Sequence, residues 1–186
     1  LSNTGVQALN LSGALGWQED DHGAEIYFSS FNTEIGILRA SHTGSPGDLD
    51  SAIRSPQPLY IEDFTYAIDP PSQKINHQLL KVSGFKKISG VGTLNVLYGG
   101  QLNQRREYDI RRQSQAGKAA LSLKLFSNTL DVFLDHRIAR MEGSIGINGT
   151  YKDNSNVPGI DIRPLIPNYK QFNAGLFIIE KLRKNN

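Results

Sequence analysis

The sequence contains no cysteine, and this absence excludes disulfide bonds, thiolate metal sites and a cysteine nucleophile. It has no uninterrupted apolar run of about 18 residues, so no transmembrane helix is expected. The net charge is only +2, and the densest basic stretch, 105–112, is interrupted by two acidic residues. Nucleic acid is therefore not an expected partner.

Recognisable patterns for metal binding and catalysis are also missing. The four histidines are His22, His42, His77 and His136. Their spacing gives no ligand pair on one strand or helix face, so neither a metal nor another cofactor is expected. Asp131 and Asp135 share a strand face but lie about 13 Å apart by strand rise, too far for a glycosidase pair. No G-x-S-x-G motif is present. The sequence therefore predicts no catalytic residues and no enzyme.

Strand-like alternation is what the sequence does contain. In 128–136, Leu130, Val132 and Leu134 fall on one side of an extended chain and polar residues mostly on the other. Six further stretches read as strands: 5–17, 24–37, 75–88, 93–103, 141–151 and 171–182. In 24–37 the alternation is too weak to assign the faces. We predict an all-β fold, an antiparallel up-and-down meander of about seven strands.

Short and long connections alternate strictly along the chain. The short turns are expected at 19–23, 88–92 and 137–140, and the long loops at 38–74, 104–122 and 152–170. In an antiparallel meander this order places every short turn at one end of the sheet. Outer-membrane β-barrels have this asymmetry, whereas a soluble sandwich has no need of it. Ser45, Pro46 and Asp48 predict one short helix inside the first long loop.

The apolar strand faces allow two interpretations. They contact lipid in a membrane barrel, or they form the core of a soluble secreted β-sandwich that binds a carbohydrate or small ligand. The opposite faces carry mainly Asn, Ser, Thr and Gln, which suits a water-filled lumen. Trp17 and Tyr98, on the apolar faces, fit an interfacial aromatic girdle and a protein core equally well. The strand pattern alone favours the barrel and leaves the sandwich open.

Three stretches resemble a known family. They are FNTEIGILR (31–39), NQRREYDIRR (103–112) and NVPGIDIRPLIPNY (156–169), and they look like segments of TonB-dependent outer-membrane receptors of the Bacteroidetes type. The resemblance implies that 1–186 is an internal fragment of a transmembrane β-barrel of about 22 strands, without the plug domain. It also implies a bacterial outer-membrane location and import of a ferric-siderophore or similar nutrient complex.

The same resemblance implies the partners. They are the plug domain and remaining barrel strands, the TonB complex, lipid and lipopolysaccharide, and the iron chelate or other nutrient. An isolated piece of such a barrel has two open edges and one apolar face, so we expect it to self-associate.

The outward-facing loops of such a receptor supply the candidate ligand contacts. These are Arg105, Arg106, Arg111, Arg112, Arg163 and Tyr169. Arginine suits an anionic chelate or a lipopolysaccharide phosphate because its planar fork binds oxyanions in pairs. The alternative for 105–112 is a strand extension in which Glu107 and Asp109 neutralise the arginines.

Overall fold

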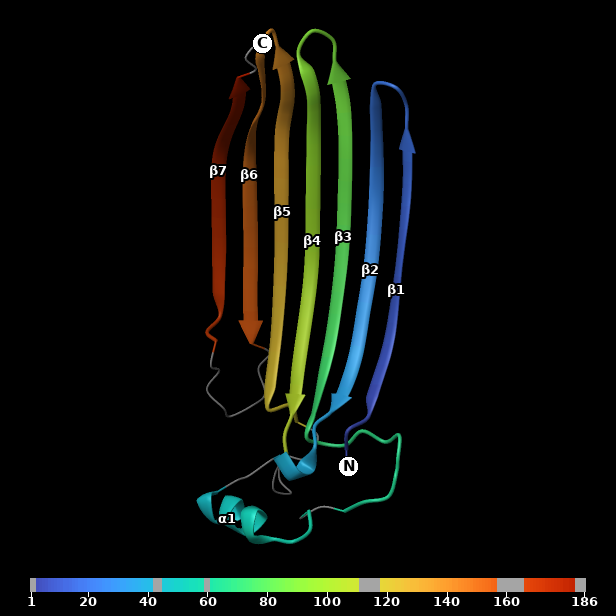
Figure 1. The fold of residues 1–186 in the computed structure, drawn as a ribbon, viewed down its shortest axis with the longest axis vertical. Coiled ribbons are helices and arrows are strands. Elements are labelled where there is room, and N and C mark those ends of the chain that lie inside the picture. The colour runs from blue at the N-terminus through green and yellow to red at the C-terminus, as the bar shows by residue number, and fades with distance from the viewer. Residues whose placement is uncertain (1–2, 42–44, 59–60, 111–117, 157–165, 183–186) are drawn as a thin grey trace.

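The structure is a computed structural model that describes residues 3–41, 45–58, 61–110, 118–156 and 166–182. Seven strands form one antiparallel sheet in which neighbours in sequence are also neighbours in space (Figure 1). The strands are β1 (Val6–Gln18), β2 (His22–Gly36), β3 (Ser72–Ile88), β4 (Gly92–Tyr108), β5 (Leu121–Ile138), β6 (Met141–Asn156) and β7 (Tyr169–Leu182). The predicted all-β, up-and-down meander is confirmed. The sheet is unclosed, because among the described residues β1 pairs only with β2 and β7 only with β6.

The connections at the two ends of the sheet differ greatly in length. Residues 19–21, 89–91 and 139–140 make short turns at one end, and residues 37–71, 109–120 and 157–168 connect the strands at the other end (Figure 1). Two of the turns use a left-handed backbone, at Gly90 (φ 72°) and Ala139 (φ 52°). Tight antiparallel hairpins favour this conformation because it matches the twist of the strands. We call the two ends of the sheet the turn end and the loop end.

Strands β3, β4 and β5 extend further toward the loop end than the alternation predicts. β4 continues to Tyr108, so Arg105 and Arg106 lie in a strand and not in the loop 104–122. β6 likewise continues to Asn156, and Tyr169 begins β7 instead of lying in the loop 152–170. In β4 the extension is mainly polar, and in β5 the alternation changes phase, but backbone pairing between strands depends on neither.

The first long connection contains a 3₁₀ turn, η1 (Arg39–Ser41), and a helix, α1 (Pro46–Arg54). The predicted helix start is confirmed, because Ser45 caps α1 and its Oγ accepts a 3.1 Å hydrogen bond from the Asp48 amide. Among the described residues, no helix combines the length and hydropathy that a membrane-spanning helix needs.

The strand register puts the apolar rows in line across the sheet. Residues directly opposite one another in an antiparallel pair lie on the same face. Val132 of β5 is opposite Val96 of β4 on one side and Ile147 of β6 on the other. The register also assigns the faces of β2, since Ile26 is opposite Val82 of β3. Each strand therefore adds its apolar side to one common face.

Candidate functional site: the two faces of the sheet

An apolar belt crosses all seven strands on one face. Its members, which we call the belt, are Leu9, Leu11, Leu15, Trp17, Ile26, Phe28, Leu80, Val82, Leu94, Val96, Tyr98, Leu102, Phe126, Leu130, Val132, Leu134, Ile145, Ile147, Tyr151, Phe172, Leu176 and Ile178. In β5 the belt runs from Phe126 to Leu134, which is roughly 27 Å along the strand. The lipid-facing band of a transmembrane barrel is about 25 Å tall.

Nothing in the described structure covers the belt. Sixteen of its 22 members are exposed, by 37% for Val82 to 85% for Leu176, the other six are half-buried, and none is buried. The chain exposes 13563 Å² in total, whereas a compact monomer of 20.6 kDa exposes roughly 8,900 Å². An apolar surface of this extent on a soluble monomer is far outside the usual range. The belt is therefore a surface that something else covers.

The belt lies on the convex side of the sheet. From Gln73 to Ser83 of β3, side chains on the belt face are exposed and those on the other face are half-buried, in strict alternation. Side chains on the inner side of a curved sheet crowd and shield one another, so the half-buried face is the concave one. An open hollow of about 720 Å³ lies on this face near the turn end, lined by Glu25, Lys81 and Phe133 among others.

The concave face is mainly polar across the middle of the sheet. One of its rows reads Ser12, Ser29, Leu79, Gln101, Ser127, Lys152 and Gln171 from β1 to β7. An ion pair crosses it between Lys81 Nζ and Glu25 Oε1, 3.8 Å apart. Asp135, nearer the turn end, accepts hydrogen bonds from Asn95 Nδ2 (2.9 Å) and from Ser144 Oγ. Such a wall suits contact with water or with a polar protein surface.

The polarity of the two faces reverses near the loop end. Beyond the belt, the convex face carries polar residues such as Lys74, Arg106 and Lys124. At the same level the concave face becomes apolar in β5, where Leu121, Leu123 and Leu125 follow one another on that side. The belt therefore ends at a sharp boundary on the loop-end side.

Two of the predicted ligand contacts occupy opposite faces of β4. Arg105 lies on the concave face between Ile75 and Leu123, and its Nη2 is 2.5 Å from Glu107 Oε1. The ion-paired strand extension is therefore the observed arrangement for Arg105. Arg106 lies on the convex face, opposite Lys74, and no partner for an ion pair with it is found among the described residues.

Among the described residues, Tyr169 is not brought together with Arg105. Tyr169 lies on the concave face at the start of β7, opposite Asn154. Strands β5 and β6 separate it from β4, which is roughly 14 Å of sheet. Arg111, Arg112 and Arg163 lie outside the described residues.

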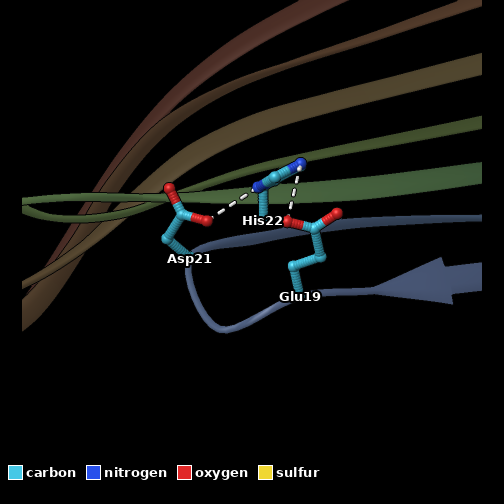
Figure 2. Close-up of side chains that lie close together, drawn as sticks. All are labelled: Glu19, Asp21 and His22. Carbon is cyan, nitrogen blue, oxygen red and sulfur yellow. Dashed lines mark hydrogen bonds and ion pairs between the residues drawn. The ribbon is translucent and has the colours of Figure 1, made fainter.

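A small polar cluster occupies the β1–β2 turn. His22 Nδ1 lies 2.7 Å from Asp21 Oδ1 and His22 Nε2 lies 4.0 Å from Glu19 Oε2 (Figure 2). The hydrogen bond with His22 holds the pKa of Asp21 below its ordinary value of 3.8. The spacing of histidines in the sequence did not predict this cluster, because its nitrogen and oxygen atoms come close together only when the turn folds. Its three side chains are those of a surface ion-pair network, and they would also suit a divalent metal.

The chain matches no protein-family model, no curated protein and no solved structure. The geometry described above is thus the basis for any functional assignment.

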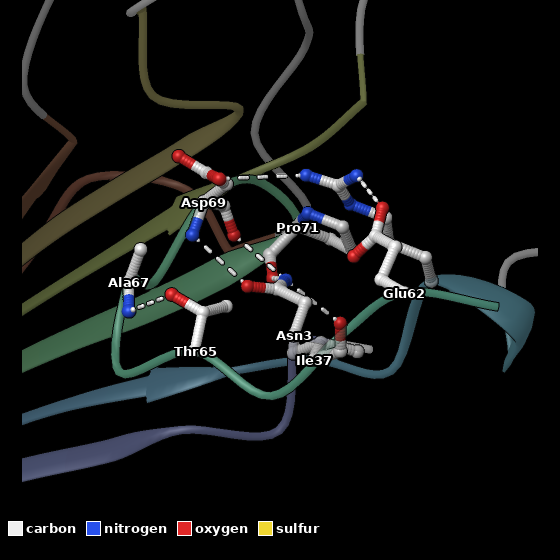
Figure 3. Close-up of polar contacts among 8 residues, drawn as sticks. Asn3, Ile37, Glu62, Thr65, Ala67, Asp69 and Pro71 are labelled. Atoms are coloured by element: carbon white, nitrogen blue, oxygen red, sulfur yellow. Dashed lines mark hydrogen bonds and ion pairs between the residues drawn. The ribbon is translucent and has the colours of Figure 1, made fainter. Parts of the chain in front are cut away.

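A second structural site was not visible in the sequence. Asn3 is 6% exposed and its Nδ2 donates to the carbonyl oxygens of Ile37, Asp69 and Pro71, at 3.0, 2.7 and 2.9 Å (Figure 3). Its Oδ1 accepts from the Asp69 amide at 2.9 Å. These contacts join residues 34 to 68 positions apart in the sequence, so no local sequence pattern predicts them. They fasten the first long connection to the loop end of the sheet.

Proposed function

We propose that the chain is part of the wall of a transmembrane β-barrel in the bacterial outer membrane. The observation that carries the proposal is the uncovered apolar belt on the convex side of an unclosed meander. A soluble barrel or sandwich places its apolar residues inside, where the strands curve toward one another or meet a second sheet. A membrane barrel places them outside, and its inner side is polar.

The connections support the same proposal. Bacterial outer-membrane barrels have short periplasmic turns and long extracellular loops. In this arrangement the turn end with Gly90 and Ala139 faces the periplasm, and the loop end with α1 faces outward. The polar residues that bound the belt on its loop-end side then lie at the level of the lipid headgroups.

The resemblance of 31–39, 103–112 and 156–169 supports a more specific proposal. The barrel is that of a TonB-dependent receptor that imports a ferric-siderophore or similar nutrient complex. The convex face contacts lipid and lipopolysaccharide, the concave face surrounds a plug domain, and the long connections contribute to the ligand mouth. Transport is then driven through the plug by the TonB complex, and this chain catalyses no reaction.

Fractionation of the complete natural protein tests the barrel. We expect it in the outer membrane, with a faster-migrating band on gels of unheated samples that shifts after boiling. A soluble protein whose migration does not depend on heating would overturn the proposal and favour a sandwich whose core includes the belt.

Two neighbouring substitutions test which face meets lipid. Leu130 lies in the middle of the belt and Thr129 lies on the concave face. Leu130→Arg should impair membrane insertion, because an arginine at the bilayer midplane costs roughly 2–4 kcal/mol. Thr129→Arg should insert normally, because its side chain enters a polar lumen. Equal insertion of the two variants, measured by the heat-shifted band, would contradict the assignment of the faces.

Uptake tests the receptor. A strain carrying the natural protein should take up its ferric-siderophore only when its TonB complex is intact. Uptake that persists at the same rate without the complex would leave the barrel in place and remove the receptor assignment.

A further inference from the structure

The free edge of β1 lacks the features that protect edge strands, and it resembles a strand in the interior of a larger sheet. Its sequence, VQALNLSGALGWQ, contains no charged residue and no proline, and all 13 residues are exposed. Strands that end a sheet in water are usually protected by charge, proline or a bulge, because free backbone groups recruit further strands. The opposite edge strand, β7, carries Lys170, Glu180 and Lys181. We therefore expect the unprotected edge of β1 to pair with a further strand.

A projecting loop is fastened beside this edge. Residues 62–69, which we call the strap, begin and end on one guanidinium, because Arg39 Nη1 lies 2.5 Å from Glu62 Oε1 and Arg39 Nη2 lies 3.5 Å from Asp69 Oδ2. Asn3 holds the Asp69 end with two further hydrogen bonds (Figure 3). Thr65 Oγ1 accepts from the Ala67 amide at 3.0 Å and stiffens the tip. The strap is thus held in one conformation before any partner arrives.

The strap overhangs the free edge of β1. Ile68 packs against Gly5, directly before β1, where a Cβ would lie 3.1 Å from Ile68 Cγ1 and 3.8 Å from the Tyr66 carbonyl oxygen. The chain N-terminal to Ile68 continues past β1 to the outer side of the sheet before it returns to β3 (Figure 1). Phe64 and Tyr66 lie on this overhang. They are 83% and 87% exposed, and their rings meet edge to face at 5.0 Å. The strap therefore carries two highly exposed aromatic side chains next to the start of β1.

We propose that Phe64 and Tyr66 form a clasp over the β-strand that pairs with the free edge of β1. The partner is an antiparallel strand of the same protein, with small or aliphatic side chains beneath the two rings at the loop end. This inference rests on the proposed function, since it requires the sheet to continue past β1. It adds that the first long connection holds the pair formed by β1 and the partner strand together at the extracellular end.

Photo-crosslinking in the complete natural protein tests the clasp. With p-benzoylphenylalanine in place of Tyr66, irradiation of outer membranes should join the strap to the strand paired with β1, as identified by mass spectrometry of the digest. The same group in place of Ile53, which is 73% exposed on α1, is the matched control and should not react with that strand. Crosslinks from position 66 to lipid, to a second polypeptide or to the peptides reached from position 53 would overturn the clasp.

A stability measurement covers the case in which the photoreactive variant does not fold. The double variant Phe64→Ser/Tyr66→Ser should lose its heat-shifted band at a lower temperature than the wild type, whereas Ile53→Ser should not. Equal temperatures for all three proteins would overturn the clasp. Failure of the proposed function is distinguishable, because the wild-type protein itself would then lack a heat-shifted membrane form.

Discussion

At the scale of single residues, the concave face contains one position where only glycine fits between two rings. Gly146 of β6 lies between Phe133 of β5 and Phe177 of β7, whose ring centroids are 6.4 Å apart. A Cβ at position 146 would lie 2.6 Å from Phe133 Cβ and 2.6 Å from Phe177 Cζ. The rings cover the backbone of the glycine and bring three strands together near the turn end.

Gly146→Ala should therefore destabilise the protein by about 1–3 kcal/mol, the usual cost of overpacking. Gly13→Ala is the matched control in another strand, because nothing lies within 4 Å of a Cβ at that position. The control should lie within about 1 kcal/mol of the wild type. Unfolding of the two variants in detergent, followed against temperature or denaturant, measures the difference. Indistinguishable midpoints would show that the rings move aside at no cost.

The turn residue Asp21 gives a prediction about pH. Its pKa lies below the ordinary value because it shares a hydrogen bond with His22, so the folded state binds its proton less readily than the unfolded state. The resulting stabilisation is present above the unfolded pKa and is lost as the pH falls through the lower, folded pKa. His22→Ala should raise the pKa of Asp21 toward 3.8, as measured by NMR titration of the carboxyl carbon. An unchanged titration midpoint would show that His22 is not the cause.

At the scale of elements, Asn3 determines whether the strap is ordered. Asn3→Asp keeps the size of the side chain and its tolerance of the left-handed backbone (φ 57°), but it replaces the donor to three carbonyl oxygens with an oxygen. Leaving such buried acceptors unpaired costs about 1–3 kcal/mol. We expect faster hydrogen exchange and proteolysis in the strap, with the sheet unchanged.

Asn10→Asp is the control for this substitution. Asn10 only accepts a hydrogen bond, from the Asn32 amide at 3.0 Å, and an aspartate oxygen accepts it equally well. Equal exchange rates in the strap of both variants would contradict the role assigned to Asn3.

The elements also show what the sequence could predict and what it could not. Alternation identified seven strands, and the faces of all but β2, because most strands keep one phase through the belt, as in Leu130, Val132 and Leu134. It misplaced the loop end of β4 because the residues after Leu102 are mainly polar, and Arg105 was assigned to a loop for this reason. It misplaced the loop end of β5 because the phase reverses there: Leu121, Leu123 and Leu125 face the concave side, so the apolar period breaks where the strand itself continues.

The capping signal at Ser45 was predictable because it depends on residues only three apart. The strap was not, because Arg39, Glu62 and Asp69 meet only through long-range contacts. The predicted contacts Arg105 and Tyr169 share a face, and the meander order places β5 and β6 between them.

At the scale of the whole molecule, the described part of the chain has no apolar core. No apolar side chain of the described residues is buried, and both β1 and β7 end the described sheet with a free edge. Its stability therefore depends on whatever covers the belt and the edges. The 186-residue chain alone should remain dispersed only in detergent and should self-associate when detergent is removed. Light scattering after size-exclusion chromatography measures this, and a clean monomer without detergent would contradict it.

Because the strands extend past the belt, the surface available for anchorage and the connections available for recognition lie apart. β5 continues from Phe126 to Leu121, and β4 from Leu102 to Tyr108, so the second long connection begins and ends roughly 17–20 Å beyond the belt along the strands. A bulky object held by that connection stands clear of the layer that covers the belt. Substitutions that adapt the protein to a thicker or thinner layer therefore fall on residues that never touch the object. Recognition and anchorage can change independently during evolution.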